Sequence, residues 1–314
     1  MSGPPRVPLG RLETPIEPLD RLSERWGGPR IFVKRDDLTG MALSGNKVRK
    51  LEFCLGEALA LGLRRVLTCG GVQSNHCRAT AIACARLGLE CVLYLRTEEM
   101  QPKPEGNLLL DLIAGAEVRY VTRQEYRALG PTDEGYWIPE GASNEVGLWG
   151  YRAAGEELRG RRFDALVHAV GSGGTTAGLI AARLETPIIG VCVCNDSEFF
   201  HGRIDAVLAR AVERWPELGP LPPSREGAEI LDGFVGYGYA QGSADEWALL
   251  REVAETEGLL LDPVYTVKAM AGLRQAIRDR RFTRGQEVLF LHTGGLFSLF
   301  SAAQGGFIGE GGVA

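Results

Sequence analysis

The sequence lacks several features that would place it in other classes of protein. It has no uninterrupted apolar run of about 20 residues, which a membrane-spanning helix requires. Its first residues, Met1–Arg6, lack the apolar core of a secretory signal. Its 7 cysteines show no paired CxxC spacing, which argues against a disulfide framework and a zinc site. These absences predict a cytoplasmic protein with reduced thiols, no bound metal and no membrane partner.

Charge of one sign does not gather anywhere along the chain. The net charge is −5, the pI is near 5.6, and basic residues are scattered among acidic ones, so nucleic acid is not an expected partner. Lysine is scarce beside arginine. The lysines are Lys34, Lys47, Lys50, Lys103 and Lys268. Because a guanidinium is not a nucleophile at neutral pH, any amine chemistry must involve one of these few positions.

With 314 residues and 45% apolar content, the chain can bury a large core. Short β-rich runs alternate with helical apolar stripes, such as the one formed by Val48, Leu51, Leu55 and Ala58. The predicted strands are Arg30–Lys34, Arg65–Thr68, Glu90–Leu95, Val118–Val121, Ala165–Val170, Ile188–Val193 and Glu287–Leu291. This alternation predicts an α/β protein with helices covering mostly parallel sheets.

Two loop-forming zones, Gly40–Gly45 and Pro139–Gly150, enclose a central block of strands and helices. We expect this block, residues 48–149, to be a small inserted α/β domain. Residues 1–47 and 150–314 would then form the large domain.

The strongest local motif, Val170–Gly178, follows an apolar strand and opens a helix. Its glycines allow close approach of the main chain, and Ser172 and Thr175 add hydroxyls at a helix N-terminus, where an anion is stabilised. The motif lacks the Gly-Lys-Ser/Thr ending of a P-loop and differs from the dinucleotide fingerprint. Phosphate binding and a tight strand-to-helix turn both fit it.

Three other motifs also lie where a loop meets a helix or strand. Lys47 follows Ser44–Asn46 at a predicted helix start, where the dipole and burial favour the free amine, although this motif taken alone favours an ordinary exposed lysine. Ser74 and Asn75, after Gly70–Gln73, are either helix caps or ligands for a carboxylate and a phenolic oxygen. The third group contains loop tyrosines and the segment after the last strand. It comprises Tyr237, Tyr239, Tyr265 and His292–Gly295.

Taken together and in this order, the motifs resemble the D-cysteine desulfhydrase and 1-aminocyclopropane-1-carboxylate (ACC) deaminase family of pyridoxal-phosphate (PLP) enzymes. The resemblance covers nearly the whole chain, and the order of the motifs makes it specific. The matching segments are Lys34–Leu38, Ser44–Lys47, Gln73–His76, Ile138–Asn144, the glycine motif, Leu261–Tyr265 and His292–Gly295. It implies PLP fold type II, with two open twisted, mostly parallel sheets and the cofactor between a large and a small domain. It also implies a homodimer acting on a small amino acid.

The resemblance further implies the roles of individual residues. Lys47 would hold the cofactor covalently, and Asn75 would hydrogen-bond its 3′ oxygen. Gln73 and Ser74 would hold the substrate carboxylate, while Tyr239 and Tyr265 would act at the leaving-group side. The phosphate would be bound by Ser172, Gly173, Gly174 and Thr175. His76 is either a proton shuttle or a structural histidine, and His292 receives no catalytic role.

One position favours a particular substrate. The ACC deaminases of this family have Glu directly after the second tyrosine, and this chain has Thr266. A neutral hydroxyl, from Thr266 or preferably from Thr293, would leave the pyridine nitrogen largely unprotonated. That environment suits β-elimination of a good leaving group and therefore predicts conversion of D-cysteine to pyruvate, hydrogen sulfide and ammonia. ACC deamination, a lyase acting on another β-substituted alanine such as cysteate, and a non-catalytic phosphate-binding module remain open.

Overall fold

The computed structural model describes residues 3–99, 101–236 and 243–301. In this part of the chain the strands form two sheets. The larger sheet has the order β1-β2-β10-β7-β8-β9, and only the pair β1 and β2 is antiparallel. Its strands are β1 (Ile16–Pro18), β2 (Arg30–Lys34), β7 (Ala165–Val170), β8 (Ile188–Cys192), β9 (Glu229–Leu231) and β10 (Glu287–Leu291).

The smaller sheet is parallel throughout and has the order β5-β4-β3-β6. Its strands are β3 (Arg65–Gly71), β4 (Glu90–Arg96), β5 (Glu117–Val121) and β6 (Tyr136–Ile138). All four lie within the predicted inserted block, residues 48–149. The predicted α/β class with two mostly parallel sheets is therefore confirmed, whereas the domain boundaries themselves stay a prediction.

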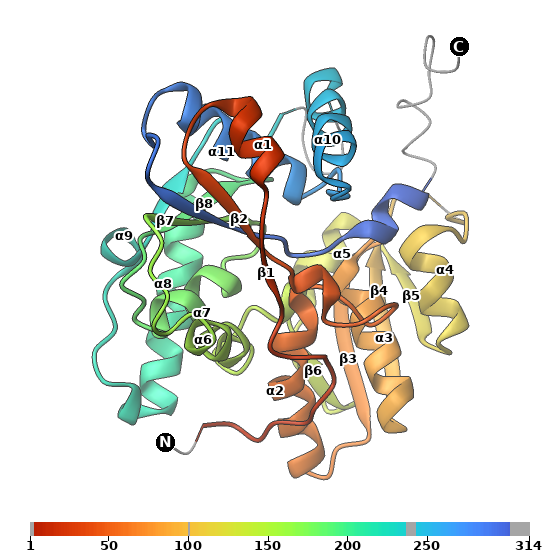
Figure 1. Ribbon diagram of the computed structural model, residues 1–314. Helices are drawn as coiled ribbons and strands as arrows, with labels where there is room; N and C mark the ends of the chain where they lie inside the picture. Colours follow the sequence, from red (N-terminus) through yellow and green to blue (C-terminus); the bar gives the residue numbers. More distant parts are fainter. Residues whose placement is uncertain (1–2, 100, 237–242, 302–314) are drawn as a thin grey trace.

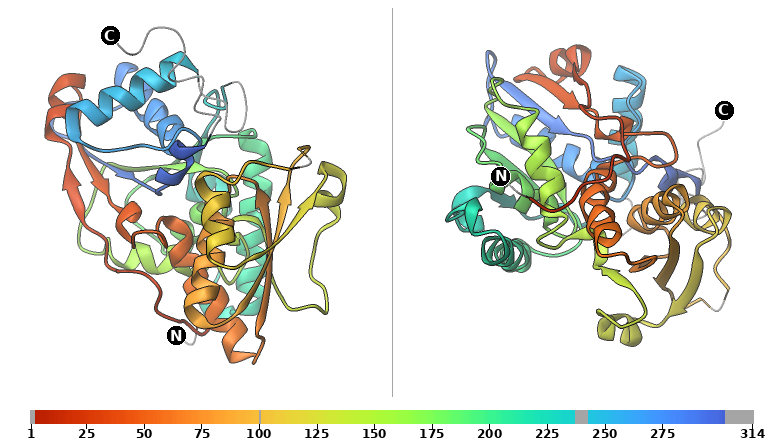
Figure 2. Two further views of the ribbon diagram at one scale, coloured as in Figure 1. Left: turned by 90° about the vertical axis from the view of Figure 1, so that its right-hand side faces the viewer. Right: turned by 90° about the horizontal axis from the view of Figure 1, so that it is seen from below.

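Helices cover both faces of the larger sheet (Figures 1 and 2). On one face lie α1 (Asp20–Trp26), α10 (Ala244–Glu257) and α11 (Thr266–Arg278); on the other lie α6 (Leu148–Glu156), α7 (Gly174–Ala181) and α8 (Ser197–Arg214). Alternate strand residues point to opposite faces. Val288 and Phe290 thus belong to a first apolar core cluster, which lies on the side of α1, α10 and α11. Leu289 and Leu291 belong to a second cluster, which lies on the side of α6, α7 and α8.

The second cluster continues into the smaller sheet, so one apolar core joins both sheets. It includes side chains of α2 (Asn46–Ala60), α3 (Asn75–Leu87) and α4 (Gly106–Ile113). The remaining helical segments are short: α5 (Arg123–Ala128), α9 (Ser224–Gly227), η1 (Asp36–Leu38), η2 (Glu140–Ala142), η3 (Pro216–Leu218) and η4 (Leu296–Phe300). No helix in the described ranges has both the length and the apolar character needed to cross a membrane.

A buried polar network anchors α2. The Arg49 guanidinium donates to both carboxylate oxygens of Asp36, each at 2.8 Å, and also to Glu157. Tyr151 on α6 donates to Asp36 at 2.6 Å. Because the Arg49 charges and Tyr151 stabilise the carboxylate, the pKa of Asp36 is held below its usual value in spite of burial. The helix that carries Lys47 is therefore fixed against the larger sheet.

Candidate active site

The site lies at the carboxyl ends of the parallel strands in both sheets. A cavity of about 340 Å³ is lined by Ser74, Arg96 and Glu140, which follow or end β3, β4 and β6. It is also lined by Gly171–Gly173 after β7 and by Thr293 after β10. Ligands in open α/β sheets bind at such an edge, and the volume suits a small cofactor with its substrate.

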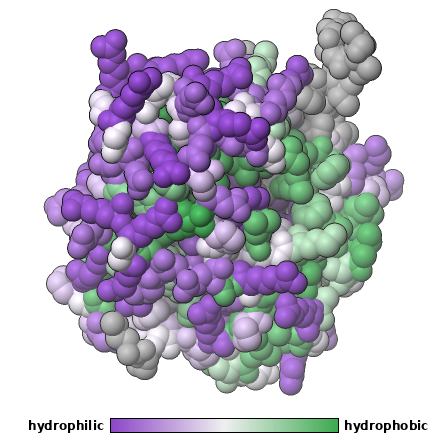
Figure 3. Space-filling model, in the orientation of Figure 1, coloured by the Kyte–Doolittle hydropathy of each residue, from purple (hydrophilic) through white to green (hydrophobic). Residues whose placement is uncertain are grey.

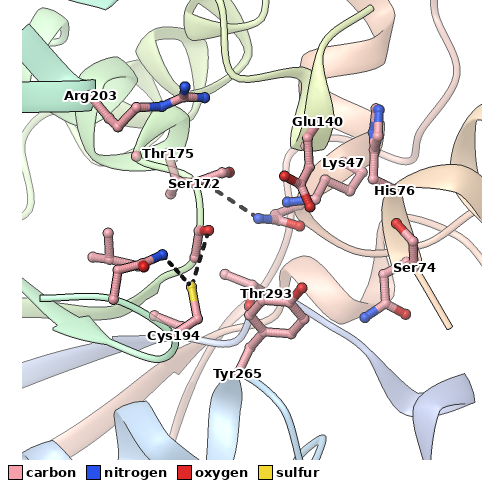
Figure 4. Close-up of a pocket in the computed structure, with 18 of the residues that line it drawn as sticks. Lys47, Ser74, His76, Glu140, Ser172, Thr175, Cys194, Arg203, Tyr265 and Thr293 are labelled. Carbon is pink, nitrogen blue, oxygen red and sulfur yellow. Dashed lines mark hydrogen bonds between the residues drawn. The ribbon is translucent and has the colours of Figure 1, made fainter. Parts of the chain in front are cut away.

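Lys47 lies in the first turn of α2, and its side chain enters this cavity (Figure 4). The helix begins after Gly45, whose φ of 91° lies in the region that favours glycine. A Cβ at that position would lie 2.8 Å from the Thr293 carbonyl oxygen, which accepts a hydrogen bond from the Asn46 amide at 3.0 Å. A glycine is therefore needed to bring the start of α2 against residue 293.

Burial lowers the pKa of the Lys47 amine to about 8, and the carboxylates of Glu140 and Asp262 oppose that shift. Both the neutral and the charged amine are thus accessible near neutral pH. Glu140, at the end of β6, points to the same part of the cavity as Lys47 (Figure 4). Such an amine can attack an aldehyde and can also exchange protons.

The glycine motif forms the opposite wall of the cavity. Gly173 has a φ of 84° and precedes α7, and Ser172, Gly173 and Thr175 line the cavity. Gly174 does not line it. A Cβ there would lie 2.8 Å from the Ser143 Cα, so this glycine permits close packing at the start of α7. The predicted strand-to-helix turn is therefore present, with two hydroxyls directed toward the cavity.

Ser74 and Asn75 line the cavity at the start of α3, but the Gln73 side chain does not. The Ser74 hydroxyl caps the helix by accepting from the Cys77 amide at 3.2 Å. Gln73 instead accepts from the Asn107 amide at 2.8 Å and donates to the Glu105 carbonyl at 3.0 Å. The geometry favours a role for Gln73 in attaching α4 rather than in contacting substrate through its side chain.

Some of the remaining predicted positions line the cavity and others do not. Tyr265 and Thr293 line the cavity, whereas Tyr239 lies outside the described residues. The Thr266 hydroxyl donates to the Asp262 carboxylate at 2.7 Å and is buried beneath the start of α11. His292 is buried, with Nε2 and the Leu260 carbonyl 2.9 Å apart. Thr293 is thus the better placed of the two threonines considered from sequence.

His76 fits the structural interpretation. Its Nε2 lies 2.7 Å from the Thr68 hydroxyl, which donates its own proton to the Ile138 carbonyl. Nε2 must then donate, so Nδ1 carries the lone pair and has no hydrogen-bond partner in the structure. Burial and the nearby charges of Lys47 and Lys50 hold the pKa of this imidazole well below its usual value.

Sequence reasoning missed several charged residues of the site. Lys50 is buried one turn after Lys47, and its Nζ donates to the Gly141 carbonyl at 3.3 Å. A Cβ on Gly141 would lie 2.7 Å from the Ser172 hydroxyl, so Lys50 is close to the glycine motif. The spacing of three residues on one helix face was the available signal. Among the described residues, the charged side chains that line the cavity besides Lys47 are Arg96, Arg123, Glu140 and Arg203.

These residues fit PLP. The Ser172–Thr175 turn offers hydroxyls and a helix N-terminus to a phosphate, and Lys47 offers an amine to an aldehyde. All seven cysteines are free, and the half-buried Cys194 lines the cavity. Burial raises the pKa of the Cys194 thiol, so its environment does not favour the thiolate.

A model of the pyridoxal-phosphate dependent enzyme family matches residues 7–294, so the chain belongs to that family and PLP is its cofactor. A Thermotoga maritima protein provisionally named an ACC deaminase is 42% identical, with 95% of this chain and 99% of that protein covered. The Arabidopsis thaliana bifunctional D-cysteine desulfhydrase/ACC deaminase is 37% identical, with 93% and 78% covered. The crystal structure of an ACC deaminase homologue aligns with a TM-score of 0.83 at 34% identity, with 97% and 95% covered.

Proposed function

We propose that this chain is a carbon–sulfur lyase that converts D-cysteine and water to pyruvate, hydrogen sulfide and ammonia. The observation that carries the proposal is one cavity shared by the Lys47 amine, the Ser172–Thr175 turn and the neutral hydroxyl of Thr293. Glu140 is the carboxylate among the described lining residues, and it lies beside Lys47 rather than beside Thr293 (Figure 4). The named activities of the relatives agree with this reaction.

Several of the lining residues have a part in the proposed reaction. The Lys47 amine would hold the cofactor covalently and would take the proton from the substrate α-carbon. Ser74 and the first amides of α3 bind the substrate carboxylate, and Tyr265 lies toward the leaving sulfur. Thr293 would provide a hydroxyl for the ring nitrogen. When bound, the cofactor delocalises the electron pair left on the α-carbon.

ACC deamination is the second candidate, because a bifunctional relative carries both names. A third is elimination from a β-substituted alanine with a negatively charged substituent, such as cysteate. It is favoured by Arg96 and Arg123, which line the cavity from the ends of β4 and β5. Arg96 stacks on Tyr126 at 4.9 Å, and neither guanidinium has an ion-pair partner within the described ranges.

A substrate panel tests these alternatives. Purified protein with PLP should release sulfide from D-cysteine faster than it forms 2-oxobutyrate from ACC or sulfite from cysteate. The enantiomer L-cysteine and the alcohol D-serine complete the panel, since they test stereochemistry and leaving-group quality. Preferred turnover of ACC or cysteate would replace the proposed substrate while leaving the family unchanged.

The protein is also proposed to form a homodimer in the cytoplasm. Apolar side chains are exposed on α4 and η4, including Leu109, Ile113 and Phe300. Figure 3 shows apolar surface on the side of the molecule where Figure 1 places these two elements. An apolar surface of this kind supports association between copies. Sedimentation of the purified protein measures the oligomeric state.

A further inference from the structure

The amide of Asn75 can be placed in the cavity in two orientations that differ chemically. One presents Nδ2, a hydrogen-bond donor, and the other presents Oδ1, an acceptor. Only the donor orientation can stabilise a phenolate oxygen. The described contacts of Asn75 decide between the two orientations, through residues that lie outside the cavity.

Asn107, at the start of α4, is fully buried and contacts this amide. Its Nδ2 donates to Asn75 Oδ1 at 3.2 Å and to the Gln73 carbonyl at 2.9 Å. Two acceptors therefore surround one end of the Asn107 side chain, and that end must be the NH₂ group. Because Asn75 Oδ1 is occupied as an acceptor, its Nδ2 is the atom left to face the cavity.

Arg78 fixes the other end of Asn107. Its Nε donates to Asn107 Oδ1 at 2.9 Å. A guanidinium has donors and no acceptor, so this contact cannot be reversed by rotating the Asn107 amide. The direction of donation therefore runs from Arg78 to Asn107, from Asn107 to Asn75, and from Asn75 into the cavity.

Arg78 is itself held in place by buried contacts. It is 1% exposed, and its other nitrogens donate to the Ala42 carbonyl, to the Ser44 hydroxyl at 3.4 Å and to the Ser44 carbonyl at 3.2 Å. The ring of Phe297 lies 4.9 Å from the guanidinium. The hydrogen bonds from Arg78 to Asn107 and from Asn107 to Asn75 are called the relay below. The contacts of Arg78 connect this relay to the loop that immediately precedes Lys47.

We propose that Arg78 and Asn107 are positioning residues that set Asn75 as a hydrogen-bond donor toward the 3′ oxygen of the cofactor. The inference rests on the proposed function for the placement of that oxygen near Asn75. Neither residue touches the cavity, so both act through Asn75. The relay explains why α4 is tied so closely to the turn that carries the site residues.

The test combines Asn107→Asp with Asn75→Ala. The new carboxylate accepts from Arg78 but cannot donate to Asn75, so the Asn75 amide rotates and presents Oδ1 to the cavity. We expect PLP to bind the dialysed Asn107→Asp protein about 10-fold more weakly, as for loss of one hydrogen bond to a charged group. The visible absorbance band of the bound cofactor should titrate at a different pH.

The double variant separates positioning from general damage to the fold. If Asn107 acts through Asn75, adding Asn107→Asp to Asn75→Ala causes no further loss of PLP affinity. Asn144→Asp is the matched control, because Asn144 Oδ1 accepts from the Gly147 amide at 2.8 Å and a carboxylate preserves that contact. Asn107→Ala replaces Asn107→Asp in the same cycle if the latter fails to fold.

Two results would overturn the relay in distinguishable ways. Additive losses of PLP affinity in the double variant would refute the relay and leave the proposed function intact. The same holds if Asn107→Asp changes neither the affinity nor the titration while Asn75→Ala has a clear effect. If Asn75→Ala alters neither PLP affinity nor the titration of its absorbance, both the relay and the proposed placement of the cofactor fail.

Discussion

At the scale of single residues, the site depends on an amine whose pKa lies close to neutral pH. Burial lowers the pKa of Lys47 to about 8, and two carboxylates oppose the shift. The groups near it include Lys50 on the same helix, His76 on α3, Glu140 at the end of β6 and Asp262 before α11. Of these, Glu140 could be changed without disturbing a buried hydrogen-bond network.

We therefore expect the rate at which the dialysed protein captures PLP to depend on pH. Attack on an aldehyde requires the neutral amine, so the rate should rise as the pH increases through about 8. Glu140→Gln removes a carboxylate that raises the Lys47 pKa, so the midpoint should move to lower pH. Stopped-flow absorbance measures this rate. The control is Glu98→Gln, because Glu98 is an exposed carboxylate just after β4 that does not line the cavity. An equal shift in both variants would count against a specific effect of Glu140.

The sequence motifs indicated Lys47, Asn75 and the glycine turn because each needs an unusual local pattern. Lys50 and Glu140 were missed for physical reasons. Lys50 looks like any charged helix residue until its burial is known, and Glu140 follows a strand of only three residues that no periodicity indicated. Gln73 resembled a ligand in sequence, but its amide is used to hold α4.

At the scale of secondary-structure elements, long apolar strands were predicted best. The bounds of β2, β7 and β10 agree with the sequence prediction, because mostly apolar residues fill the interior of each strand and are buried on both faces. The strands β1, β6 and β9 have three residues each and were not predicted. β6 and β9 pair with strands far away in the sequence, whereas β1 pairs with the next strand, β2.

The contact between Gly45 and Thr293 shows that the start of helix α2 is fixed by the backbone of a residue far away in the sequence. Gly45→Ala should destabilise the protein by ~2 kcal/mol or more, because the new Cβ meets the Thr293 carbonyl and φ is positive. Gly62→Ala is the control, since Gly62 has a φ of 73° and no atom within 4 Å of its Cβ position. Chemical unfolding measures both, and equal losses would show that the contact with Thr293 is unimportant.

At the scale of the whole molecule, the cavity is a consequence of topology. Parallel strands place all their carboxyl ends at one edge, and the two sheets bring these edges together. The sequence predicted two such sheets but could not show that β4 and β5 would contribute Arg96 and Arg123. That placement depends on strand order, which local patterns do not encode.

We propose that the Lys47 amine and the Ser172–Thr175 turn bind one molecule of PLP between them. Borohydride reduction of the PLP-loaded protein, followed by digestion and peptide mass spectrometry, identifies the lysine that carries the cofactor. We expect a single modified peptide that contains Lys47. Modification of Lys50 in place of Lys47, or no modified lysine in protein that retains activity, would contradict it.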